Sequence, residues 1–181
     1  MPATDPTVPA TEPPVPATHS WRWLVLGLAT GIALTVSVIA LWPSAAPSRQ
    51  DIVAERGSVV MPFDQEATTH VFEPTESGGI QTVVADDPND VEQVALVRGH
   101  LLDEAERFRR GDFGDPAMIH GSEMPGLAVL ESSVGSLTVT YREVPAGGEI
   151  TYRSAEPGVV QALHDWFAAQ LADHGDHAMP G

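Results

Sequence analysis

The chain has 181 residues, nine arginines and no lysine against 25 acidic residues, and no cysteine; its formal net charge is −16. This length suits one domain of ordinary size. The acidic balance excludes nucleic acid as a partner, because an acidic surface repels phosphates. The absence of cysteine excludes disulfides, iron–sulfur clusters, thiolate zinc sites and a cysteine nucleophile.

Residues 1–20 are proline-rich, with the near-repeats PAT and PVPAT. Proline lacks a backbone donor and fixes φ, so such a segment favours extended, solvated chain over a packed core. We therefore expect residues 1–20 to form a disordered tail that acts as a spacer.

The segment Leu24–Leu41 carries no charged residue and is flanked by tryptophans at both ends. About 20 apolar residues cross the hydrocarbon core of a bilayer, and tryptophan favours its interfaces. We predict a transmembrane helix over residues 21–42. A cleaved signal peptide ending near residue 46 is the rival interpretation.

Arg22 at the N-terminal edge of this span favours a cytoplasmic N-terminus and an extracytoplasmic C-terminal part, as in a single-pass protein of a bacterial inner membrane. The lipid bilayer is then an expected partner. Gly27 and Gly31 form a GxxxG pattern, through which two such helices could approach each other.

After the span, residues 43–66 mix proline, serine, alanine and charge, which is typical of a stalk. Residues 67–178 then form the predicted domain. Its first strands are 69–72 and 80–85, with a turn between them. Asp87-Pro88 precedes a helix whose apolar positions run from Val91 to Phe108 at helical spacing.

A loop rich in Gly, Asp and Pro follows over residues 111–126, and three further strands are predicted at 127–131, 137–144 and 149–154. A second helix carries the apolar positions Val160, Leu163, Phe167 and Leu171. The order predicts an α+β domain: a small antiparallel sheet packed with two main helices in a ββαβββα-like arrangement, preceded by the transmembrane helix.

Four strings carry a resemblance to a known family: TTHVFEPT, GGIQTVVADDP, RGHLLDEAERFRRGDFGDPAMIHGSEMPGL and ALHDWFAAQLADHGDHA. They resemble an uncharacterised bacterial membrane-anchored family whose members often receive the label aspartate carbamoyltransferase. The resemblance implies no functional residue. The label does not fit, because the Ser-Thr-Arg-Thr-Arg and His-Pro-x-Gln motifs of that enzyme's catalytic chain and the four zinc-binding cysteines of its regulatory chain are absent.

Histidines are the most chemically informative residues of the domain. We predict that His100, His120 and His164, with Met124 nearby, meet at one metal site, with further candidates at His70, Glu104 and His174. Imidazole with thioether suits copper, and imidazole with carboxylate suits zinc. A histidine beside an apolar stripe is more often a core residue, and His174 near the C-terminus is better explained by a frayed acidic end.

Two other functions stay open. A small metal-independent hydrolase-like enzyme could use Asp115 and His120, because a carboxylate can orient an imidazole. An accessory or assembly subunit of a larger membrane complex would need only the anchor, the stalk and an acidic surface. The leading interpretation is a membrane-anchored extracytoplasmic binding domain, with copper or zinc as its ligand.

Overall fold

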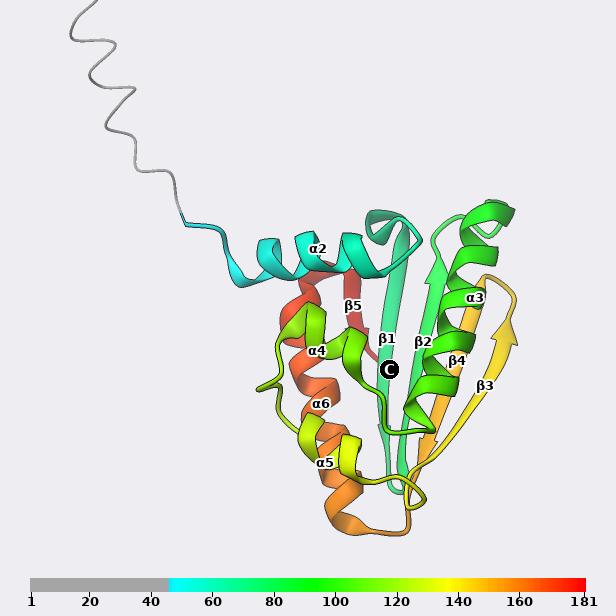
Figure 1. The fold of residues 1–181 in the computed structure, drawn as a ribbon. Helices are drawn as coiled ribbons and strands as arrows, with labels where there is room; N and C mark the ends of the chain where they lie inside the picture. Colours follow the sequence, from blue (N-terminus) through cyan, green and yellow to red (C-terminus); the bar gives the residue numbers. More distant parts are fainter. Residues whose placement is uncertain (1–45) are drawn as a thin grey trace, which may run out of the picture. The chain divides into compact units, whose positions relative to one another are not determined.

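The computed structural model describes residues 46–181, and residues 47–181 form one compact unit. A five-stranded sheet has the strand order β3-β4-β2-β1-β5 (Figure 1). The strands are β1 (Thr68–Thr75), β2 (Gly78–Ala85), β3 (Thr138–Val144), β4 (Gly147–Arg153) and β5 (Ala178–Pro180). All neighbours pair antiparallel except β5, which runs parallel to β1.

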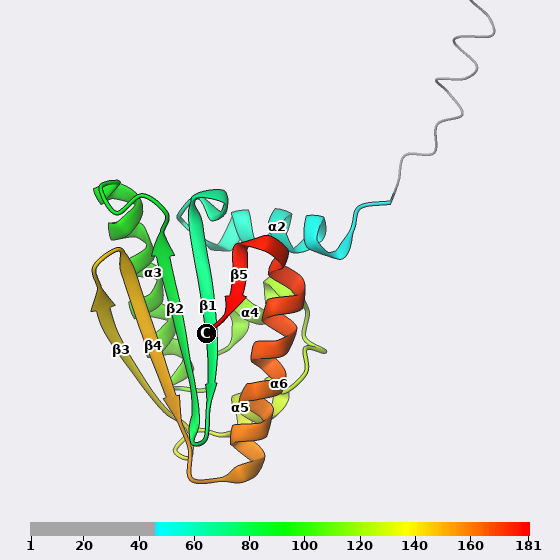
Figure 2. The same cartoon turned by 180° about the vertical axis from the view of Figure 1, so that it is seen from behind.

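Two long helices pack on one face of the sheet, and no helix within residues 46–181 covers the opposite face (Figures 1 and 2). They are α3 (Val91–Phe108) and α6 (Pro157–His174). Most of the apolar positions predicted from the sequence lie on the buried faces of these helices, including Val97 and Leu101 on α3 and Leu163 and Phe167 on α6, whereas Val91 at the start of α3 is exposed. Amphipathic helices bury one stripe against a sheet, as expected.

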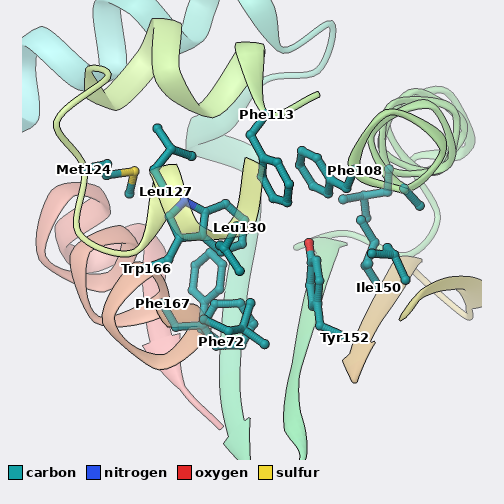
Figure 3. Close-up of a cluster of buried hydrophobic side chains, with 14 of the residues drawn as sticks. Phe72, Phe108, Phe113, Met124, Leu127, Leu130, Ile150, Tyr152, Trp166 and Phe167 are labelled. Atoms are coloured by element: carbon teal, nitrogen blue, oxygen red, sulfur yellow. The ribbon is translucent and has the colours of Figure 1, made fainter. Parts of the chain in front are cut away.

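Aromatic rings fill the space between the sheet and the helices (Figure 3). Phe108 and Phe113 stack with ring centroids 4.4 Å apart, and Trp166 meets both rings edge-on. Tyr152 on β4 and Phe167 on α6 extend the cluster toward the sheet. These large rings hold α6 and the segment after α3 against the sheet, because each buries much apolar area.

The sheet is mixed, so the predicted antiparallel ββαβββα arrangement was wrong. The described residues form five α-helices: besides α3 and α6 they are α2 (Arg49–Val60), α4 (Gly114–His120) and α5 (Leu127–Ser132). The strand predicted at 127–131 is α5: Leu127 and Leu130 are buried at helical spacing, whereas Val129 is exposed. A short apolar run does not distinguish strand from helix by periodicity.

The sequence contained no signal for β5. Its three residues pair with His70, Val71 and Phe72 only because α6 returns the chain to the edge of the sheet. Such a pairing is decided by tertiary packing, since three residues show no periodicity.

The segment 43–66, predicted as a stalk, contains helix α2. Ser48 caps its first turn: the Ser48 hydroxyl accepts from the Asp51 backbone, and the Asp51 carboxylate accepts from the Ser48 backbone. This capping box explains why helix begins there. The helix crosses the ends of α4 and α6 (Figure 1).

The proline-rich tail and the span predicted at residues 21–42, including Gly27 and Gly31, lie outside the described residues. Among residues 46–181, no helix combines the length and the apolar character needed to cross a bilayer.

Candidate functional site

A small cavity of about 50 Å³ lies between the sheet and α3, α4 and α6. A volume of this size holds a few water molecules or a small ion. Aromatic and aliphatic groups form part of its wall. Polar side chains form the rest: His70, Gln81, His100, Glu104, Asp115, His120, Gln170 and His174.

One of these histidines, His174, contacts two others, and the three come from three different elements. The rings of His70 and His174 stack with centroids 4.8 Å apart, and the rings of His120 and His174 meet edge-on at 5.1 Å. We call His70, His120 and His174 the histidine cluster.

Local structure explains how each ring of the cluster reaches this place. His70 and Phe72, two residues apart on β1, both lie on the face that is covered by helices. His120 is the last residue of α4, which ends at Gly121 with φ 96°, and His174 ends α6 before Gly175 with φ 56°. Glycine adopts positive φ without strain, so both helices stop immediately after a histidine.

Asp173 orients one ring of the cluster. Its Oδ2 lies 2.9 Å from Nδ1 of His120, and because a carboxylate only accepts, Nδ1 carries the proton. The Nε2 atom of His120 therefore keeps its lone pair. Burial opposes the charge of Asp173, but hydrogen bonds from Arg49 and His120 outweigh it and lower the pKa of this carboxyl.

The cluster is uncharged near neutral pH. Burial is the main cause in each ring: it holds the pKa of His70 well below its usual value, lowers the pKa of His174 to about 4, and lowers that of His120. Neighbouring imidazoles add to the effect on His70 and His174. Neutral imidazoles with free lone pairs are the form that binds metal ions.

A second polar group lies at the other side of the cavity. The Glu104 side chain is 7% exposed, and Arg107 pairs with Glu104, Asp112 and Asp115. Burial, together with the nearby Asp115, raises the pKa of Glu104 to about 8. One guanidinium faces three carboxyl groups here, so a proton on Glu104 relieves the excess negative charge.

Two buried polar atoms beside the cavity have no hydrogen-bond partner within the described chain, namely Trp166 Nε1 and Gln170 Oε1. Both residues line the cavity. Buried polar groups are normally paired with protein or with ordered water. The cavity is therefore suited to a polar occupant.

The structure separates the residues predicted to share a metal site. His164 lies ten residues before His174 on α6, about 15 Å along the helix axis. Its Nε2 donates instead to Thr75 O and Gly78 O, at 3.0 and 2.9 Å, in the β1–β2 turn. His164 is thus a structural residue of the hairpin.

The other predicted ligands lie closer to the cluster. His100 and Glu104 line the cavity, although His100 packs edge-on against Phe63 at 5.5 Å. Met124 is buried, but it lines a shallow hollow outside His120, together with Asp173. Asp115, proposed as the partner of His120, pairs with Arg107, and the carboxylate on His120 is Asp173.

Sequence reasoning placed His70 and His174 in a secondary role, did not pair Asp173 with His120, and missed Arg49. The available signal was the string DHG at the end of an apolar helical stripe, where glycine ends the helix and leaves the two preceding side chains beside its packed face.

In residues 46–181, no three His, Asp or Glu side chains are already arranged around a common point as metal ligands. The cluster would have to turn its rings to hold an ion. Comparison with protein families, curated proteins and solved structures finds no match. These comparisons neither support nor refute the family resemblance noted in the sequence.

Proposed function

We propose that this domain binds a transition-metal ion, copper or zinc, through His70, His120 and His174. The observation that carries the proposal is the contact of His174 with two other uncharged imidazoles, one of which, His120, is oriented by a carboxylate. A carboxylate on the far nitrogen of a ligand histidine is the usual support in metal sites, because it fixes the ring and raises its basicity.

The change needed for binding is local. Zinc takes imidazole nitrogen at about 2.0–2.1 Å, so stacked rings cannot bind it without rotation. The adjoining cavity of about 50 Å³ supplies room for the ion and for a rotated His174. His120 needs no new tautomer, since its Nδ1 already faces Asp173.

Metal titration of the full-length protein in detergent tests the proposal, with Zn²⁺ competed against a chromophoric chelator and Cu⁺ in parallel. His174→Ala should weaken binding beyond the roughly 10–100-fold that loss of a carboxylate partner costs, and Asp173→Asn should fall within that range. His164→Gln is the matched control on the same helix, because a Gln amide can still donate to the hairpin carbonyls. Equal affinity for His174→Ala and the control would refute this function.

We also propose that the domain lies on the extracytoplasmic side of a bacterial inner membrane. The support is the charge-free run Leu24–Leu41 and the adjacent Arg22. A periplasmic-only reporter fused to the C-terminus should be active, and cytoplasmic activity would reverse the orientation. Association with a membrane complex is part of this proposal, and crosslinking in intact membranes would detect it.

A further inference from the structure

The apolar contacts of helix α2 with the rest of the domain come from its middle and its last turn. Val53 and Gly57 are buried and Val60 packs, partly buried, against the core, whereas no residue of the first turn, residues 49–52, is buried. A helical turn without buried apolar residues gains little from packing and opens at low cost. Polar contacts at its first turn must therefore contribute much of its attachment.

Arg49 provides these contacts. Its Nε and one terminal nitrogen donate to the two oxygens of Asp173 at 2.7 and 2.6 Å, and the same terminal nitrogen donates to His120 O at 2.8 Å. Gln50 lies close to Gly175, since a Cβ added to Gly175 would be 2.9 Å from its amide nitrogen. The first turn of α2 is thus tied to the residues next to His120 and His174.

The attached helix borders the approach to the histidine cluster. A hollow of about 230 Å³ is lined by Gln50, Asp51 and Val53 of α2 on one side and by His70 and His174 on the other. The same two histidines line the inner cavity. The stacked pair therefore separates the solvent-side hollow from the cavity, and α2 borders that hollow.

We infer that α2 is a lid, latched by Arg49 on Asp173, whose opening sets the rate at which small molecules and metal ions reach His70 and His174. The metal part of this inference rests on the proposed function, whereas access of a neutral probe does not. Loss of the Arg49–Asp173 contact should raise the rates of binding and release together, because the helix itself does not bind the ligand.

The first test measures access without metal. Full-length protein in detergent is treated with diethyl pyrocarbonate, which acylates neutral imidazole, and the initial rate at each histidine is read by mass spectrometry. Arg49→Gln should accelerate acylation of His174 about tenfold, equivalent to about 1.4 kcal/mol. Arg49→Lys keeps the charge but loses the two-pronged contact, so it should give an intermediate rate.

Two controls separate lid opening from unfolding. Arg56→Gln alters another α2 arginine, whose contact with Ile119 O is long at 3.5 Å, and should leave the rate unchanged. His164, at the other end of α6, should react at the wild-type rate in every variant. Unchanged acylation of His174 in Arg49→Gln, or equal acceleration of His164, would overturn the lid.

The second test follows zinc exchange by stopped flow. In Arg49→Gln, association and dissociation should both accelerate about tenfold, with Kd within about threefold of wild type. Faster dissociation alone would mean that Arg49 acts by positioning Asp173, and the lid would be rejected. Wild-type protein that binds neither zinc nor copper would refute the proposed function, while the acylation test would still decide on the lid.

Discussion

His174→Gln tests the effect of the buried histidine cluster on stability. The fragment 47–181 suits the measurement, because it contains the whole described core and Trp166 as its one tryptophan, fully buried. Burial lowers the pKa of His174 from 6.5 to about 4. The folded protein therefore binds this proton less readily than the unfolded chain, so His174 costs stability as the pH falls from 6.5 toward 4.

The size of the effect follows from these two pKa values. Integrating proton linkage from pH 7 to pH 5 gives a loss of about 2 kcal/mol in the free energy of unfolding. Glutamine does not titrate, so the stability of wild type relative to His174→Gln should fall by about this amount. Glu104 changes stability in the opposite direction, but it is present in both proteins and cancels in the difference.

Urea unfolding of both proteins at pH 7, 6 and 5, followed by Trp166 fluorescence, supplies the free energies. Most of the loss should occur between pH 6 and pH 5, below the unfolded pKa of histidine. Parallel pH profiles for wild type and His174→Gln would refute the reasoning, because the ring would then titrate alike in folded and unfolded chains.

Two further predictions concern Glu104 and a pair of glycines. The pKa of Glu104 is raised to about 8, so its contribution to stability is present below pH 4.5 and is lost as the pH rises toward 8. In urea unfolding, the free energy of unfolding of Glu104→Gln relative to that of wild type should therefore rise by about 3 kcal/mol between pH 5 and pH 8. Gly126→Ala should destabilise the fold by about 1–3 kcal/mol, because φ is 79° and the new Cβ would overlap Ala162 O. Gly99→Ala, at an exposed position of α3 with open space around it, should stabilise the fold by about 0.5–1 kcal/mol. Thermal melts of Gly126→Ala and Gly99→Ala measure these changes, and equal shifts in Tm would contradict the argument.

The local pattern of the sequence located the elements whose apolar residues repeat over several turns or along a strand. The stripe predicted over Val91–Phe108 is the buried face of α3 except for the exposed Val91, and Leu163 and Phe167 of the second predicted stripe are buried on α6. The β-branched run 80–85 lies within β2. These elements are long enough for their period to be read. The short α5 is not, because the apolar run at 127–131 is too brief to distinguish a helix from a strand.

The segment 43–66 shows a different limit. Its composition is that of a stalk, yet Ser48 and Asp51 form a capping box and Arg49 finds a buried acceptor more than a hundred residues away. Composition reports the average polarity of a segment, whereas an ion pair depends on what the folded chain places beside it.

For the candidate site as well, the sequence determined one part and the tertiary structure the other. The sequence by itself identified histidine as the informative residue type and named His70, His120 and His174 among its candidates, because residue chemistry can be read without a fold. It could not determine which histidines meet. His120, His164 and His174 all stand near apolar positions, but the return of α6 along the sheet brings His174 to His70 on β1 and leaves His164 at the hairpin. Only the tertiary structure decides this, because contacts between residues a hundred positions apart depend on the packing of whole elements and leave no local periodicity.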